Sequence, residues 1–425
     1  MQTTASLSVP DSSPGSSRLR VFILLAFVLP CVPATSGAQE AYTLQDLIRI
    51  GRERNPTLLA LRADQAAAEA HRRASGRWEN PALHFESGTG KPYQTGDRRT
   101  VEGWTIRQAV ENPLARHHRL SSLSSLAAVA GEEVRMGILE VDYEVRIHFF
   151  RVLFLMELLE LARLNEEALE AMSDLVAVRA EVGEVRELEA IRLRIEHRRA
   201  RNETEAAAME LDQYRRHLNT FLGNVLPPDF RLVGELAAEE HDPDPAVLTE
   251  EVLPNHPALL AVAREQEAAL ATMRATGVGW IPGPVVSGSF RKELDGEIRS
   301  VGIGLQIPLW DFSRAAVDRE RQTVRALEER EQALRQELEA QVMIHHNHLR
   351  LARWTLTLFQ EGLLEEAETS MQIAEAAYRE GEISFLEYLD ARRTYSFIQI
   401  DYRQALYDWN VERVALERTV GGGTL

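Results

Sequence analysis

The chain has almost no cysteine and few aromatic residues, and these shortages limit what it can be. Its 425 residues include one cysteine, Cys31, so a disulfide framework is excluded. Aromatic residues make up only 7% of the sequence, and no proline follows Pro308. The remainder is rich in Ala, Leu, Glu and Arg, a composition typical of long helices packed as coiled coils.

The sequence also lacks the short motifs that carry well-known catalytic chemistry. It has no G-x-S-x-G, no P-loop and no H-E-x-x-H. Its carboxylates follow helical periodicity and are not gathered in one place, so we expect neither an enzyme nor a cofactor. The net charge of −17 argues against nucleic acid as a partner.

The N-terminal residues predict export from the cytoplasm. Arg18 and Arg20 precede an apolar run, and small residues follow it up to Ala38. This pattern is typical of a secretory signal peptide, covering residues 1–38 and cleaved after Ala38. Cys31 lies within it, and Pro30 before it fits a lipoprotein cleavage box poorly, so we expect Cys31 to be discarded, with lipidation as the alternative. Elsewhere no run of about 20 apolar residues predicts a transmembrane helix.

Residues 378–391 predict a helical hairpin with an acidic tip. Gly381 can end one helix, because glycine adopts the left-handed conformation at little cost. Ser384 can cap the next helix, with Glu387 as its capping-box partner. Glu387 and Asp390 are spaced i, i+3, so both acids are expected on one helix face next to the turn.

The same pattern occurs about 200 residues earlier, around Gly183, which indicates a tandem duplication. Asn55-Pro56 likewise corresponds to His256-Pro257. We therefore predict a first structural repeat at 39–225, a connection at 226–246 and a second repeat at 247–425.

Each repeat is expected to contain a helix, a β-hairpin, a long helix, a tip and a return helix. The first long helix runs from Pro113 to the Gly183 turn and the second from Ser313 to the Gly381 turn. Each would be about 100 Å long at 1.5 Å per residue. The other expected elements are helices at 43–76 (broken at Asn55-Pro56), 187–222 and 384–419, and strands at 81–90, 100–110, 283–291 and 301–307.

The predicted strands alternate apolar and polar residues, and their apolar faces carry Leu83, Phe85, Trp104, Ile106, Val301, Ile303 and Leu305. Four strands cannot close a barrel, and open edges would aggregate, so the chain is expected to oligomerise. Two copies would supply eight strands, and three would supply twelve with room for a water-filled lumen. Lipid outside and water inside suit such strands, whereas the alternative is a soluble β-sandwich face.

Residues 377–394, AYREGEISFLEYLDARRT, resemble the TolC family of outer-membrane efflux proteins, and most of all its heavy-metal, CzcC-like branch. The Asn55-Pro56 and His256-Pro257 openings and the stretch Leu305–Leu309 are softer matches, and the resemblance covers essentially the whole mature chain. It implies a homotrimer, with a twelve-stranded β-barrel in the outer membrane and a long α-helical tunnel in the periplasm. It also implies two partners, a periplasmic adaptor and an inner-membrane transporter of the resistance-nodulation-division class.

The expected fold class is therefore mainly α with a β-barrel part, in which long antiparallel helical hairpins accompany four strands per chain of a trimeric transmembrane barrel. The expected function is the exit duct of a tripartite pump that exports heavy-metal cations. A drug-efflux or type I secretion channel is one alternative, and a soluble periplasmic coiled-coil adaptor is another. An adaptor would carry one hairpin and a lipoyl-like module, whereas this sequence predicts two hairpins and two strand pairs.

The resemblance assigns Glu387 and Asp390 to an acidic ring at the periplasmic mouth. Three copies would bring six carboxylates together, which favours cations and raises carboxylate pKa values by repulsion. The plainer interpretation is a solvated helix face. Tyr378 and Glu189 match the family's gate network, but Ile383 stands where an arginine is expected, so the closing contacts must differ.

Two further groups of residues complete the candidate sites. By the resemblance, Gly183, Glu184, Gly381 and Glu382 form the tip turns on which an adaptor docks. His345 and His348 share one helix face and are a weak candidate for binding Zn²⁺ or Cu²⁺. A duct should not hold its cargo tightly, so we expect these histidines to be solvated and predict no resident metal.

Overall fold

The computed structural model describes residues 41–91, 96, 98–239, 243–305, 307 and 313–422. The predicted signal peptide, its cleavage after Ala38 and Cys31 therefore lie outside the described residues. The same holds for part of the Leu305–Leu309 stretch and for residues 240–242 of the predicted connection.

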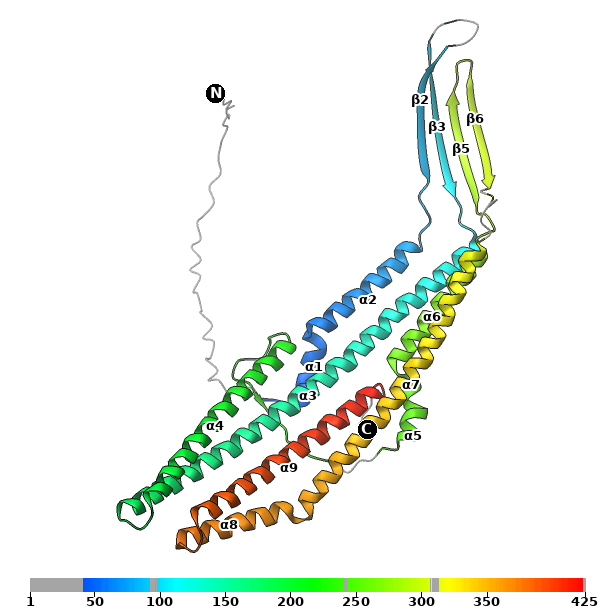
Figure 1. Ribbon diagram of the computed structural model, residues 1–425. Coiled ribbons are helices and arrows are strands. Elements are labelled where there is room, and N and C mark those ends of the chain that lie inside the picture. Colours follow the sequence, from blue (N-terminus) through cyan, green and yellow to red (C-terminus); the bar gives the residue numbers. More distant parts are fainter. Residues whose placement is uncertain are drawn as a thin grey trace, which may run out of the picture. The chain divides into compact units, whose positions relative to one another are not determined.

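Apart from the two-residue strand β1, the helices and strands in the first half of the chain follow the predicted order (Figure 1). The 69 residues of the longest helix, α3, extend over about 100 Å at 1.5 Å per residue. The elements are β1 (Ala41–Tyr42), α1 (Leu44–Arg54), α2 (Pro56–Ser75), β2 (Ala82–Gly90), β3 (Arg99–Ala109), α3 (Pro113–Glu181) and α4 (Glu187–Phe221).

The second half repeats this order and adds short helical turns before its first long element. The predicted fold class, mainly α with long antiparallel hairpins and four main strands, is confirmed. The elements are β4 (Arg231–Leu232), α5 (Pro245–Val247), η1 (Leu248–Val252), η2 (Leu253–Asn255), α6 (Pro257–Gly277), β5 (Pro284–Lys292), β6 (Glu297–Leu305), α7 (Arg314–Leu358), η3 (Phe359–Leu363), α8 (Leu364–Glu380) and α9 (Phe385–Thr419).

Helices α2 and α6 begin in the same way. The Asn55 side chain accepts a hydrogen bond from the Leu58 N–H at 3.1 Å, and Nδ1 of His256 accepts one from the Ala258 N–H at 3.1 Å. Proline occupies the first helical position after each cap, where its missing N–H has no partner to lose. The division into repeats at 39–225 and 247–425 stays a prediction, and these equivalent caps support it.

The second long helix is interrupted, so the prediction of a continuous helix from Ser313 to the Gly381 turn is wrong. α7 ends at Leu358, a π-helical turn covers Phe359–Leu363, and α8 follows in a new direction (Figure 1). Gly362 lies in this turn with a φ of 122°, a conformation that side chains rarely permit. Strong helix formers on both sides hide this interruption in the sequence.

The main apolar core lies along α3. Phe149, Phe154 and Leu155 of α3 are at most 3% exposed and belong to one cluster with Trp409 and Leu416 of α9. This cluster packs the return helix of the second half against the long helix of the first. None of the helices in the described ranges is both long enough and apolar enough to cross a membrane.

The connection between the two halves carries a strand that the sequence did not predict. β4 pairs in parallel with β1 through Ala41 with Arg231 and Tyr42 with Leu232. Phe230 and Leu232 are buried in the main core. Strands of two residues give no periodic signal, so this pairing became visible only in the folded chain.

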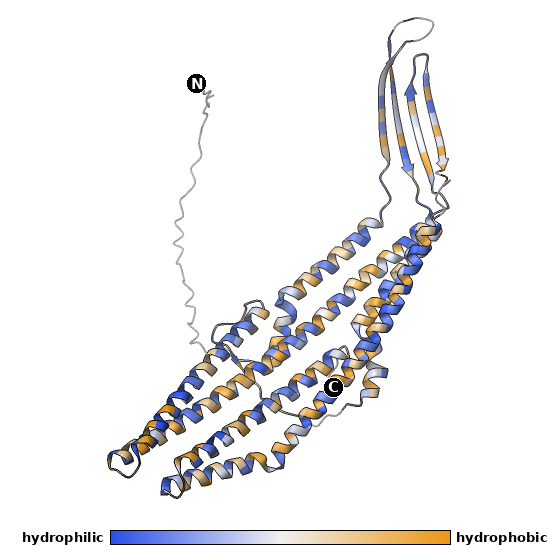
Figure 2. Ribbon diagram, in the orientation of Figure 1, coloured by the Kyte–Doolittle hydropathy of each residue, from blue (hydrophilic) through white to orange (hydrophobic). Residues whose placement is uncertain are grey.

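The four long strands form one antiparallel sheet in the order β2-β3-β5-β6, which joins the two halves. The register places Phe85 opposite Trp104 and Trp104 opposite Phe290. By this register, one face carries all seven predicted apolar residues, each at least 47% exposed: Leu83, Phe85, Trp104, Ile106, Val301, Ile303 and Leu305. Apolar and polar residues alternate along the strands (Figure 2). β2 and β6 form the two edges of this sheet.

Candidate functional site

The two predicted tip turns have the same backbone geometry. Gly183 and Gly381 both adopt φ of 79°, the left-handed conformation expected after a helix end. The N–H of Glu184 donates to the Arg179 carbonyl at 2.9 Å, and the N–H of Glu382 donates to the Ala377 carbonyl at 2.8 Å. The four predicted tip residues therefore occupy equivalent positions in two matching turns, and their docking role stays a prediction.

An aromatic cluster lies directly beneath the second turn. The ring of Tyr378 is stacked on Tyr388, with centroids 5.1 Å apart, and contacts Phe385 at 6.0 Å. The three side chains are buried, which fixes the angle between α8 and α9. This packing positions the residues that follow the turn.

The fold places Glu189 near Tyr378, as predicted, but the Tyr378 hydroxyl forms no hydrogen bond to the Glu189 carboxylate. Burial, together with the neighbouring Glu189 carboxylate, raises the pKa of Tyr378 to about 12. The buried Tyr378 hydroxyl has no hydrogen-bond partner among the described residues. The structure thus supports proximity of this pair, and its function in a gate stays a prediction.

Three arginines that the sequence analysis missed connect the two hairpins. Arg179 of α3 donates to the Arg379 carbonyl at 2.9 Å, Arg392 of α9 donates to the Asn165 side chain at 3.0 Å, and Arg393 pairs with Glu196 of α4 at 2.7 Å. The sequence analysis found Ile383 in place of the expected arginine. Ile383 packs against the apolar cluster of the tip, so these three arginines supply polar contacts that Ile383 cannot. The arginine pair directly after Ala391 was the available signal.

The two predicted pore acids lie on the exposed face of α9 next to the tip. Glu387 forms the predicted capping box, in which its carboxylate accepts a hydrogen bond from the Ser384 N–H at 2.7 Å. Asp390 lies one turn further along and is also exposed. Both acids line a groove between α4 and α9 that also contains Glu196 and three basic residues: Arg192, Arg199 and Arg393.

The capping box affects the ionisation of Glu387 within one copy of the chain. Hydrogen bonds from Ser384 lower the pKa of Glu387 below its usual value. The predicted increase depends on carboxylates from other copies of the chain, whereas the capping box acts within one copy. Glu387 therefore has two roles to separate by mutation, namely capping α9 and contributing negative charge.

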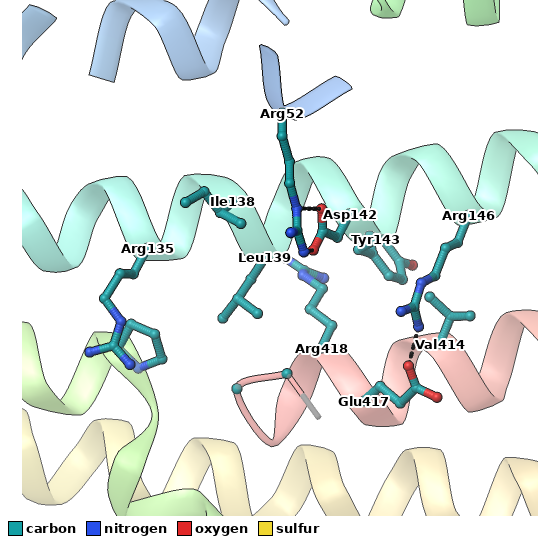
Figure 3. Close-up of a pocket in the computed structure, with 13 residues that line it drawn as sticks. Arg52, Arg135, Ile138, Leu139, Asp142, Tyr143, Arg146, Val414, Glu417 and Arg418 are labelled. Atoms are coloured by element: carbon teal, nitrogen blue, oxygen red, sulfur yellow. Dashed lines mark hydrogen bonds and ion pairs between the residues drawn. The ribbon is translucent and has the colours of Figure 1, made fainter. Parts of the chain in front are cut away.

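A second polar pocket lies where α1, α3 and the end of α9 meet (Figure 3). Two of its arginines pair with acids that also line the pocket, Arg52 with Asp142 and Arg146 with Glu417. The other two pair with acids on α3, Arg135 with Glu132 and Arg418 with Glu140. Arg418 extends over the ring of Tyr143, 4.7 Å from its centroid. Because the acids and bases neutralise one another, we assign this pocket a structural role, holding α9 against the middle of α3.

His345 and His348 lie on α7 and not at the tip. They converge with Glu412 of α9, a residue that the sequence analysis did not associate with them. No spacing rule connects positions so far apart in the chain.

Comparison with known proteins agrees with this fold. Residues 248–422 match the family model described as outer membrane efflux protein. A curated relative, the cobalt-zinc-cadmium resistance protein CzcC of Cupriavidus metallidurans, is 25% identical over 321 residues, which cover 74% of this chain and 73% of the relative.

Solved structures of similar fold include an outer-membrane channel and a protein that forms a transmembrane channel. The outer-membrane channel OprN superposes with a TM-score of 0.76 at 19% identity, covering 90% of each chain. CusC superposes with a TM-score of 0.72 at 17% identity, covering 89% of this chain and 92% of CusC. The predicted resemblance to TolC-like outer-membrane efflux proteins is confirmed, and the class of protein indicated is a transport duct rather than an enzyme.

Proposed function

We propose that this chain is the outer-membrane exit duct of a tripartite efflux pump and that its cargo is heavy-metal cations. It acts as a homotrimer, with a periplasmic adaptor docked on its tips and an inner-membrane resistance-nodulation-division transporter supplying the cargo. The similarity to a cobalt-zinc-cadmium resistance protein supports the choice of cargo.

The observation that carries this proposal is the exposed apolar face of the four-stranded sheet. Val301, Ile303 and Leu305 are between 60% and 85% exposed on that face. Apolar surface of this extent is unfavourable in water and favourable against lipid hydrocarbon. The neighbouring positions Ser289 and Ser300 lie on the opposite, polar face, where their hydroxyls hydrogen-bond to each other at 2.7 Å.

The two edges of the sheet explain why several copies are needed. β2 and β6 lie at opposite edges, and the strands between them alternate in direction. Placing β6 of one copy beside β2 of the next continues the antiparallel order, and such head-to-tail contacts close into a ring. Three copies supply twelve strands around a polar interior.

The cargo is tested by complementing a strain from which this gene has been deleted. We expect the intact gene to restore growth on Zn²⁺, Co²⁺ or Cd²⁺ and to lower the cell's content of the metal, measured by mass spectrometry. Restored tolerance to drugs or restored polypeptide secretion, without any effect on metals, would replace the proposed cargo by one of these alternatives.

The oligomeric state is tested by measuring the mass of the detergent-solubilised protein. A mass of one or two chains would overturn the trimer.

The membrane assignment is tested by a charge placed on each face of β6. Val301→Lys puts an ammonium group against lipid in each of the three copies. Near the bilayer midplane, each such charge destabilises the inserted barrel by about 2–4 kcal/mol. We expect at least a tenfold loss of trimer from the outer-membrane fraction. Ser300→Lys is the matched control, because its side chain faces the polar side, and we expect near-normal insertion. Equal insertion of both variants would show that the apolar face does not contact lipid.

A further inference from the structure

Three side chains with metal-binding atoms converge between α7 and α9. Nδ1 of His345 lies 2.9 Å from one carboxylate oxygen of Glu412, and Nδ1 of His348 lies 3.3 Å from the other. One ligand atom from each residue can be chosen so that all three lie within 4.8 Å of one another. The two imidazole rings are perpendicular, with centroids 6.3 Å apart, so they approach the carboxylate from different directions.

We propose that His345, His348 and Glu412 bind a divalent transition-metal ion of the Zn²⁺ class. Two imidazole nitrogens and one carboxylate are a ligand set that Zn²⁺ accepts, with water in the fourth position. Hard cations such as Mg²⁺ and Ca²⁺ prefer oxygen ligands and are disfavoured by two imidazoles. Metal coordination would replace the two existing contacts to Glu412 after small side-chain movements.

Neighbouring contacts hold the ligands in place, and the site is open to an ion from solvent. The contacts of His345 and His348 with Glu412 hold its carboxylate between α7 and α9. The side chain of His348 is 54% exposed, which leaves a route from solvent.

A second acid adds negative charge near these ligands. Asp408 lies one helical turn before Glu412 on α9, where it accepts a hydrogen bond from Gln404 at 2.6 Å. Burial raises the pKa of Asp408, the hydrogen bond from Gln404 lowers it, and the nearby charge of Glu412 raises it. A divalent cation at the proposed site would reduce this repulsion.

The consequence of binding is a link between two helices that are far apart in the sequence. α7 and α9 are joined here by the contacts to Glu412, and an ion would join them by coordination bonds. The site requires one chain only, so its existence does not depend on the proposed export function. We expect a bound ion to raise the thermal stability of the α7–α9 pair.

The test uses the full-length mature protein purified without a polyhistidine tag. Isothermal titration with Zn²⁺ is expected to show one ion per chain, and Co²⁺ in its place should give the visible absorption of a four-coordinate site. His348→Ala and Glu412→Gln should each weaken binding at least tenfold. His71→Ala is the control, because His71 is an exposed histidine on α2. We expect this variant to bind Zn²⁺ with the same affinity as the unmodified protein.

The outcomes separate this site from the proposed cargo. Absence of saturable binding, or binding unchanged in both variants while circular dichroism shows them folded, would overturn the site. His348 is largely exposed, so His348→Ala should fold even if Glu412→Gln does not. Metal tolerance restored in cells without binding here would refute the site and leave the export proposal standing. Zn²⁺ binding at this site without any effect on metal export would support the site and refute the export proposal.

Discussion

Gly381→Pro is expected to abolish metal export while the protein remains in the outer-membrane fraction. Gly381 has φ of 79°, whereas proline is restricted to about −65°. The Gly381 N–H also donates to the Tyr378 carbonyl at 3.1 Å, and proline has no N–H. The turn that joins α8 to α9 would therefore change, and with it the surface proposed for adaptor docking. Metal tolerance of complemented cells measures export, and immunoblots of membrane fractions measure how much protein remains in the outer membrane.

The control for this change is Gly381→Asn. Asparagine retains the N–H and tolerates the left-handed conformation better than most residues, so near-normal export is expected. No atom lies within 4 Å of the position that a new Cβ would occupy, so added volume alone should not disturb the turn. Normal export by the proline variant would show that the tip has been misplaced. Loss of its protein from the membrane would show that tip and sheet do not fold independently.

Gly183→Pro gives an independent comparison, because Gly183 has the same φ and the same open surroundings. If both tips dock the adaptor, both proline variants should lose export. A defect restricted to one variant would assign docking to that hairpin.

Neutralising Glu387 and Asp390 is expected to weaken cation selectivity and to remove block by trivalent cations. In a trimer these residues would form two stacked rings of three carboxylates one helical turn apart. A multivalent cation can bridge such a ring, whereas a monovalent cation only screens it. Single-channel recordings in a planar bilayer measure both the cation/anion permeability ratio and the block.

The choice of substitution follows from the capping box. Replacing both acids by alanine would remove the charge and also the hydrogen bond between Glu387 and the Ser384 N–H, so the start of α9 would be weakened. Glu387→Gln with Asp390→Asn removes the charge and retains a residue suited to the capping box.

Two controls make the recordings decisive. Glu382→Gln removes an exposed acid from the same turn without touching either proposed ring, and we expect unchanged selectivity. The Glu387→Gln/Asp390→Asn variant should match the unmodified protein in thermal unfolding. If that variant keeps the original permeability ratio and the original block, the two acids are only a solvated helix face.

Local rules explain how much of the fold the sequence predicted. The helix cap at Ser384, left-handed glycines at the two tips and alternation along the strands each act over a few residues. These signals therefore gave the order of elements, the matching tips and the apolar face of the sheet. The break at Gly362 was the failure, because favourable residues around it outweighed one glycine in a composition-based prediction.

Only the tertiary structure determined the contacts between residues that lie far apart in the chain. His345 and Glu412 are 67 positions apart, Arg393 and Glu196 are 197 apart, and Arg179 reaches the carbonyl of Arg379 across 200. A single sequence specifies which face of a helix each of these residues occupies. The partner on the neighbouring helix depends on how the hairpins pack against α3, because the packing of side chains in the core sets the position of every helix along its neighbour.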